Sequence, residues 1–356
     1  MWRPLDESRV GPRDAAFPEG ILMTGRIEFL PCNAARLLVR ISAWGAEGWG
    51  EAIGPDPVAL AEAGRAAVGD LPVEAEDFLD MLDSQELAAP LRCAIASAWL
   101  SARAAAAALP LAALLAPGRR PATEVPLCGV IRAVAPEPAA ERAAALVALG
   151  CRTLVVGCGT ERAADVERVA AVRQAAPAAK LRLDAAGAWN PAWAIEHLRA
   201  LWRHDIEHVA EPIPASRPLA ELGAFRRASP VPIALGESLR DVESLARALA
   251  LRVADAILVD APRAGGPDRA AAMIRAAEDA GVPVSVASRG QGAIGTAVAL
   301  HLAAILPEPA PDSAIPLDAP PGGDLAPMPA MERGAVARLP RGGGLGVSPA
   351  LAARPG

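Results

Sequence analysis

Short apolar segments separated by helical stretches constrain this chain more than any other feature. After Glu124 the segments recur roughly every 25 residues, which is the spacing of strand–helix units. The stretches between them are rich in Ala, Arg and Glu and have helical periodicity, as in residues 136–149 and 241–251. The expected strands are residues 125–131, 153–158, 180–185, 208–213, 231–235, 256–260 and 283–288.

Strand–helix alternation over such a length predicts parallel strands with helical crossovers, and hence an α/β fold. Seven or eight units favour a closed TIM barrel over an open doubly wound sheet. Gly157-Cys158-Gly159 follows a strand but lacks the third glycine of a dinucleotide-binding fingerprint, which also counts against the open sheet. We expect an eighth strand near residues 315–318.

The first 120 residues or so have a different pattern. Residues 21–30 and 35–43 are expected to be strands, and a turn then leads to Trp49-Gly50-Glu51-Ala52, as in a hairpin. Residues 57–117 have a helical pattern. The predicted organisation is an N-terminal α+β domain at residues 1–120, a barrel at 121–325, and a C-terminal segment at 326–356 that returns to the first domain.

Composition and charge exclude several classes of protein. The net charge of −6, without a basic tract, argues against nucleic acid as a partner. The most apolar segment, residues 94–116, is interrupted by Arg103 and Pro110 and predicts a buried helix pair, so no membrane span is expected. Residues 1–20 do not resemble a signal peptide. Five cysteines without a C-x-x-C pair suit a reduced, cytoplasmic protein. The oligomeric state stays open, and a homo-oligomer is possible.

Acidic residues end four consecutive predicted strands: Asp184, Glu211, Glu237 and Asp260. In a barrel these strand ends form one rim, where the chemistry of such folds lies. Three carboxylates on neighbouring strands, Asp184, Glu211 and Glu237, would repel one another without a cation, and Mg²⁺ prefers such oxygen ligands. A bound Mg²⁺ could stabilise an enolate formed by removing a proton next to a substrate carboxylate. The alternative is that each acid caps the helix that follows it.

The same segments resemble the enolase superfamily, in particular its muconate-lactonizing and o-succinylbenzoate synthase branch. The resemblance implies a capping domain over a modified TIM barrel, (β/α)₇β, and a small carboxylate as substrate. It also implies Mg²⁺ held by Asp184, Glu211 and an acid on the fifth strand, with specificity set by loops around residues 11–19 and 53–57. The segments that carry the resemblance are Trp49 to Ala52, Leu181 to Asn190, Glu211-Pro212, Pro232 to Ser238, Gly295 with Ala297 to Ala304, and Gly343 to Val347.

The third metal ligand departs from the pattern of that branch. The muconate-lactonizing type usually shows Asp-Glu-Ser, whereas this chain has Gly236-Glu237-Ser238. Gly-Glu is the form found in the mandelate-racemase and sugar-acid dehydratase branches, in which the Glu is a ligand. The resemblance therefore implies that Glu237 can complete the magnesium site.

The catalytic lysines of that branch are missing. Val155-Val156-Gly157 stands where a Lys-x-Lys pair is expected on the second strand. Asp260 replaces the lysine of the sixth strand, and Gln291 replaces the acid of the seventh.

Proton abstraction from a carbon acid needs a positioned base, and Asp260 is the inward-facing candidate. A salt bridge between Asp260 and Arg263 or Arg289, or a place in an extended metal shell, is an equally open interpretation. The histidines, which are His197, His204, His208 and His301, are expected to be surface or core residues.

Two functions of different classes remain open at this point. The first is a divergent lyase or isomerase that uses Mg²⁺-assisted proton abstraction, similar to o-succinylbenzoate synthase or muconate cycloisomerase. The second is a catalytically inactive pseudoenzyme that keeps a metal-binding or anion-binding barrel. The loss of the lysines in an otherwise intact pattern motivates the second.

Overall fold

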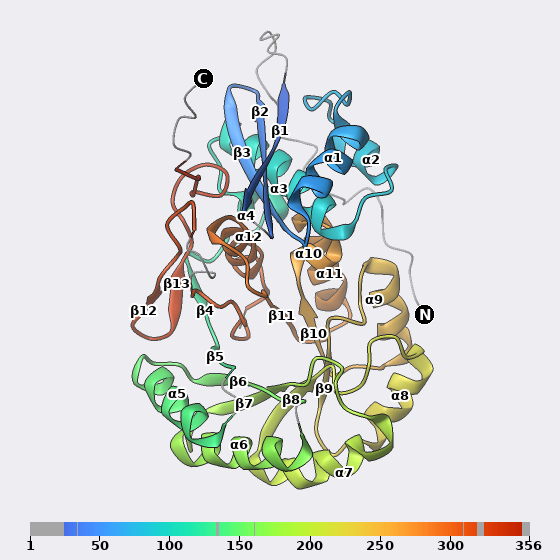
Figure 1. Cartoon of the computed structure of the whole chain (residues 1–356), viewed down its shortest axis with the longest axis vertical. Helices are drawn as coiled ribbons and strands as arrows, with labels where there is room; N and C mark the ends of the chain where they lie inside the picture. Colours follow the sequence, from blue (N-terminus) through green and yellow to red (C-terminus); the bar gives the residue numbers. More distant parts are fainter. Residues whose placement is uncertain are drawn as a thin grey trace.

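The computed structural model describes residues 25–33, 35–132, 135–159, 161–308, 310–318 and 324–350. The start of the first predicted strand and the loop predicted at residues 11–19 lie outside these ranges. Within them, a small antiparallel sheet with its helices lies above a larger parallel sheet (Figure 1).

The first unit confirms the predicted hairpin of strands followed by helices. Its three strands pair in the order β1-β2-β3, all antiparallel. Gly48 and Gly50 of the third strand lie against helix α3, where an added Cβ would approach backbone oxygens of that helix to 2.0 and 1.8 Å. The elements are β1 Arg26–Asn33, β2 Arg36–Ala43, β3 Ala46–Ile53, α1 Pro57–Val68, α2 Phe78–Asp83, α3 Ala89–Ala106 and α4 Leu111–Leu115.

Helix α3 is the core helix of this unit. All its residues from Leu91 to Ala104 are buried, and Trp99 stacks on Phe78 with ring centroids 5.6 Å apart. The alanine-rich segment is therefore the buried helix pair α3 and α4 that its composition predicts. Across the described part of the chain, none of the helices is long and apolar enough to cross a membrane.

The larger sheet contains seven parallel strands in the order β11-β10-β9-β8-β7-β6-β5. Each predicted apolar segment supplies one of them, which confirms the α/β barrel class. The strands are β5 Gly129–Ile131, β6 Thr153–Gly157, β7 Lys180–Asp184, β8 Ile206–Ala210, β9 Ile233–Leu235, β10 Ala256–Val259 and β11 Val284–Val286.

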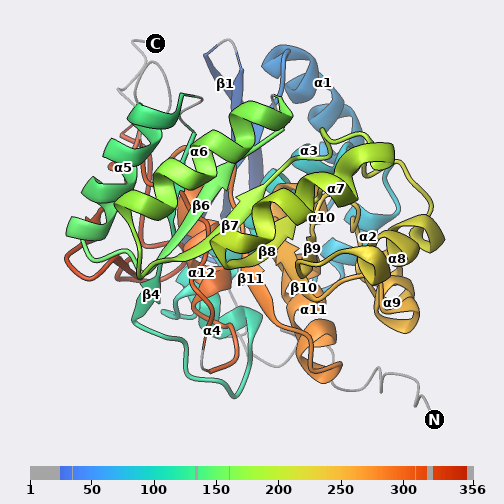
Figure 2. The same cartoon turned by 90° about the horizontal axis from the view of Figure 1, so that it is seen from below.

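Helices follow the strands and cover the outer face of this sheet (Figures 1 and 2). A helical crossover between parallel neighbours is what the alternating pattern predicts. The helices are α5 Pro136–Ala148, α6 Arg162–Ala175, α7 Pro191–Leu201 with the 3₁₀ turn η2 Trp202–His204, α8 Leu219–Ala228, α9 Val242–Leu251, α10 Ala261–Ala264, α11 Pro267–Asp279 and α12 Ala293–Ala303.

Residues 313–314 close the sheet into a barrel. On the β5 side, Ser313 N donates a hydrogen bond to Pro126 O at 3.0 Å, and Ser313 O accepts one from Cys128 N at 2.9 Å. On the β11 side, Ala314 N donates to Val286 O at 2.9 Å, and Ala314 O accepts from Ser288 N at 3.0 Å. The eighth strand is thus a short parallel bridge just before the position predicted at residues 315–318.

The C-terminal segment contacts both units. The strands β12 Met331–Glu332 and β13 Val336–Arg338 form a small antiparallel sheet with β4 Glu124–Pro126, which the sequence placed in the first barrel strand. Further on, Gly344 exchanges backbone hydrogen bonds with Leu109 and Leu111, which flank the start of α4. The exact domain boundaries remain a prediction.

A buried carboxylate joins the first sheet to the barrel. Glu51 of β3 accepts hydrogen bonds from Gly292 N at 2.8 Å and Gly295 N at 2.9 Å, at the start of α12. Arg36 of β2 pairs with Glu51 at 3.1 Å and with Asp324 at 3.3 Å. Burial raises the pKa of Glu51, although the Gly295 and Gly292 amides and Arg36 oppose that shift. The hairpin motif therefore holds the N-terminus of the last barrel helix.

We expect Glu51→Ala to lower the free energy of unfolding by about 3–5 kcal/mol, because it removes one of the two carboxylates that pair with the buried Arg36 and leaves two backbone amides without their acceptor. Glu47→Ala, on the same strand, removes an exposed pair with Arg40 and should cost about 0–1 kcal/mol. Urea unfolding followed by circular dichroism measures both. Equal losses in the two variants would contradict the role assigned to Glu51.

Candidate functional site

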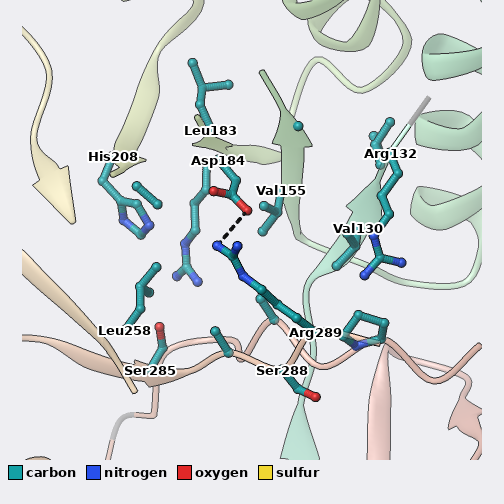
Figure 3. Close-up of a pocket in the computed structure, with 17 residues that line it drawn as sticks. Val130, Arg132, Val155, Leu183, Asp184, His208, Leu258, Ser285, Ser288 and Arg289 are labelled. Carbon is teal, nitrogen blue, oxygen red and sulfur yellow. Dashed lines mark hydrogen bonds and ion pairs between the residues drawn. The ribbon is translucent and has the colours of Figure 1, made fainter. Parts of the chain in front are cut away.

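A cavity of about 250 Å³ lies inside the barrel, where side chains from most strands face one another (Figure 3). Strand pairing aligns Val130, Val155, Arg182 and His208 as one layer of inward-facing side chains. Gly157, Asp184 and Ala210 form the next layer toward the carboxyl ends of the strands. The cavity is lined by Val130, Ile131, Arg132, Val155, Gly157, Arg182, Leu183, Asp184, His208, Ala210, Leu258, Ser285, Ala287, Ser288, Arg289, Ala314 and Pro316.

Val155 and Gly157 line this cavity at the positions where the resemblance expects two lysines. An added Cβ on Gly157 would meet one backbone oxygen at an ordinary 3.5 Å, so the packing there does not require glycine. The inner wall on this side is therefore apolar and carries no base.

A network of buried hydrogen bonds around Asp165 holds the loop that follows β6, next to this wall. Asp165 of α6 is fully buried and accepts hydrogen bonds from Gly159 N, Arg168, the Trp189 indole and His197. Burial by itself would raise the pKa of Asp165. The hydrogen bonds together outweigh this effect and bring the pKa below its ordinary value. His197 is therefore a core residue, as the sequence predicts.

Asp184 ends β7 at the rim, where the sequence places it. One carboxylate oxygen accepts from Ala186 N at 3.1 Å, and the other lies 3.5 Å from Nη2 of Arg289. Ala186 itself has a positive φ of 47°. The first predicted metal ligand thus faces a guanidinium across the cavity (Figure 3).

Glu211 follows β8 with an unusual φ of 42°, which directs its side chain toward the loop after β9. There Oε1 accepts from Gly236 N at 2.7 Å and Ser238 N at 2.8 Å, and Oε2 accepts from the Ser238 hydroxyl at 2.7 Å. Burial raises the pKa of Glu211, although these hydrogen bonds favour its charged form. Both oxygens of the second predicted ligand are therefore already bonded.

Glu237, in the loop after β9, pairs with two arginines. Its Oε1 contacts Nη1 of Arg289 and lies 3.8 Å from Nη2 of Arg263. The structure thus brings Asp184 and Glu237 together through Arg289, whereas Glu211 is bonded to Gly236 and Ser238 on either side of Glu237.

The donor set does not fit Mg²⁺ in this arrangement. Glu211 is occupied by amide and hydroxyl donors, and Arg289 lies against the two other acids. Among the described residues, no group of three His, Cys, Asp or Glu side chains is arranged to hold a metal ion. Magnesium therefore remains a prediction from the strand-end acids.

Asp260 follows β10 with an extended backbone, φ −124° and ψ 116°, before α10 begins. Because side chains alternate along a strand, Asp260 is expected to share the direction of Leu258. Leu258 lines the cavity, whereas Asp260 lies outside the set of lining residues. Its Oδ1 is buried and has no hydrogen-bond partner within the described chain. Burial raises the pKa of Asp260 to about 6, against the lowering effect of Arg263 and Arg289.

Within the described residues, Asp260 forms no salt bridge, because both candidate arginines contact Glu237 instead. Arg263 and Arg289 still act on the charge of Asp260 from a greater distance, so the pairing of Asp260 with either arginine stays a prediction. Gln291, in place of the usual strand-seven acid, is buried and outside the cavity lining.

Sequence reasoning missed three cationic or polar groups of the cavity. Arg182 and His208 face each other in register, and Arg182 is held by Glu207 and by the carbonyl of Asp312. Burial and Arg182 lower the pKa of His208 to about 4, so this histidine is neutral at pH 7. Arg132, at the end of β5, projects into the cavity and pairs with no other described residue. Strand alternation was the signal available for all three.

The comparisons with known proteins agree with this architecture. An o-succinylbenzoate synthase from Thermobifida fusca is 37% identical over 185 residues, which are 52% of this chain. The match spans only 56%, or about half, of the length of that relative.

Solved structures show the same fold. A muconate cycloisomerase from Pseudomonas fluorescens superposes with a TM-score of 0.82 at 23% identity, covering 92% of this chain and 95% of that one. A dipeptide epimerase from Cytophaga hutchinsonii, in complex with Mg and D-Ala-L-Val, gives a TM-score of 0.80 at 24% identity over 89% of each chain.

The family model described as enolase C-terminal domain-like matches residues 138–353, which span the barrel from α5 to the C-terminal segment. This match includes the carboxylates of the rim and the strands that carry them. The chain therefore belongs to the enolase C-terminal domain-like family.

Proposed function

We propose that this chain is a lyase or isomerase that binds a small carboxylate in the barrel and removes a proton next to that carboxylate. The observation that carries the proposal is the half-buried carboxyl of Asp260, whose buried Oδ1 has no hydrogen-bond partner among the described residues. Similarity to the Thermobifida fusca o-succinylbenzoate synthase supports a dehydration of the o-succinylbenzoate type.

Asp260 has the properties of a general base. A carboxylate with a pKa near 4 is a weak base, whereas burial brings the pKa of Asp260 to about 6. A base is most effective when its pKa lies near the working pH, because it is then both deprotonated and sufficiently basic. Of the predicted site residues, Asp260 alone combines burial, an unpartnered oxygen and a raised pKa of this size.

Arg132 is the group assigned to hold the substrate carboxylate. Its guanidinium points into the cavity and is exposed, and it has no partner in the described part of the chain (Figure 3). Arg182 and Arg289, the other arginines of the lining, already contact acids. A guanidinium without another partner can donate two parallel hydrogen bonds to a carboxylate. The substrate carboxylate is therefore assigned to Arg132 and not to Mg²⁺.

We expect wild-type protein to exchange substrate α-protons for deuterium, because Asp260 can take up the proton and return a deuteron from solvent. The measurement is proton NMR in deuterated water with a panel of carboxylates that carry an α-proton, dipeptides among them. Asp260→Asn should abolish the exchange, because the amide cannot act as a base.

Asp279→Asn, which neutralises an exposed acid at the end of α11, is the matched control and should exchange like wild type. Each variant is measured with millimolar Mg²⁺ and with EDTA. Undiminished exchange in Asp260→Asn would exclude Asp260 as the base.

The pH dependence of the exchange rate should report the carboxyl of Asp260. A base acts when deprotonated, so the rate should rise with pH and level off above the pKa of about 6. Below that pKa the rate should fall about tenfold per pH unit. A rate profile that is flat between pH 5 and pH 7, about one unit either side of that pKa, would assign the proton to another group.

Replacement of Arg132 by alanine should weaken ligand binding. Loss of a charge-assisted hydrogen bond of about 1.5–3 kcal/mol raises the Kd for o-succinylbenzoate by about 10- to 100-fold. Arg152→Ala, at the opposite end of the barrel, should leave that Kd unchanged. Isothermal titration calorimetry measures the Kd of both variants. Equal Kd values for wild type and Arg132→Ala would contradict the role of Arg132 in binding the substrate carboxylate.

A pseudoenzyme is the second candidate, and the apolar wall formed by Val155 and Gly157 favours it. Without lysines there, a bound carboxylate meets one base at most. This candidate predicts that o-succinylbenzoate binds in an Arg132-dependent way while no carboxylate of the panel exchanges protons. Binding and exchange together separate the two functions.

A further inference from the structure

Arg289 lies at the rim of the barrel, just after β11, and extends across the cavity toward the opposite strands (Figure 3). Its Nη2 lies 3.5 Å from Oδ2 of Asp184, and its Nη1 contacts Oε1 of Glu237. Its two partners come from β7 and from the loop after β9, so the guanidinium bridges strand ends that are not neighbours in the sheet.

The two acids have little else to balance their charge. Asp184 has one backbone amide besides Arg289, and Glu237 has the more distant Arg263 at 3.8 Å. Side-chain exposures of 33% for Asp184 and 20% for Glu237 leave both acids partly shielded from solvent. Like charges held near each other in such a place require a cation.

Glu211 takes no part in this cluster. It is 1% exposed, and both carboxylate oxygens accept hydrogen bonds from Gly236 and Ser238. A metal ion would have to displace these donors from Glu211 and, in addition, approach a guanidinium that keeps its charge at any ordinary pH. Both requirements oppose binding of a divalent ion.

We infer that the guanidinium of Arg289 occupies the position at the rim where the strand-end acids predict Mg²⁺, and that it balances their negative charge in place of the metal. The guanidinium neutralises Asp184 and Glu237 through separate nitrogens, which a planar fork of donors permits. The barrel mouth is therefore independent of divalent metal. Removal of Arg289 leaves an acidic pocket that accepts a divalent cation.

Binding of Mn²⁺, followed by electron paramagnetic resonance of the free ion, tests this inference. Wild type should show no saturable binding at millimolar Mn²⁺, whereas Arg289→Ala should bind at least about tenfold more tightly, because the repelling charge is gone. Arg289→Gln keeps much of the side-chain length and should behave in the same way if the alanine variant folds poorly.

Two controls locate the effect. Arg263→Ala removes the other arginine near Glu237 but leaves Arg289 in place, so it should bind Mn²⁺ no better than wild type. Adding Asp184→Asn to Arg289→Ala should abolish the gained binding. Millimolar Mg²⁺ should raise the Tm of Arg289→Ala and leave that of wild type unchanged.

Either of two results would overturn the inference. One is saturable Mn²⁺ binding by wild type that disappears in Asp184→Asn, which would mean that the metal displaces Arg289 from Asp184. The other is the absence of any gain in both folded Arg289 variants. Because the readout is metal binding, neither result depends on whether the barrel turns over a substrate.

Discussion

Backbone hydrogen bonds from Ser313 and Ala314 close the seven-stranded sheet into a ring, and the site depends on that closure. An open sheet would leave β5 and β11 at opposite edges. Once they are joined, Arg132 after β5 and Arg289 after β11 line the same cavity. Parallel strands then place all their carboxyl ends at one rim, which is the rule for active sites in barrels of this class.

The balance of charge at the rim follows from this arrangement. Four acids end consecutive strands, and each has a different environment. Glu211 accepts hydrogen bonds from two amides and a hydroxyl, and Asp184 and Glu237 share Arg289. Asp260 is half-buried, and its Oδ1 has no hydrogen-bond partner among the described residues. A carboxyl group at this rim is therefore a hydrogen-bond acceptor, one half of an ion pair, or a group with a raised pKa. The environment decides which, through burial and nearby charge.

The first domain is attached to this barrel through a carboxylate as well. Glu51 accepts from the first amides of α12, and Arg36 holds Glu51 and Asp324 together. Helix α12 follows the segment that carries Arg289, so the antiparallel sheet supports the rim from outside. Glu51 thus binds Gly292, which lies close in sequence to Arg289.

Sequence alone determined the elements of this protein, because hydrophobic periodicity is a local property. The seven barrel strands, the buried α3 and the rim position of Asp184 could all be read from spacing. The loss of lysines at Val155 and Gly157 follows only from the resemblance to the enolase superfamily. The tertiary structure decided which acids are free. Arg289 lies 105 residues from Asp184 in the chain, and no local pattern reveals that their side chains meet. Charge pairing depends on distances between strands, which exist only after the barrel closes, whereas strand periodicity exists in the chain itself.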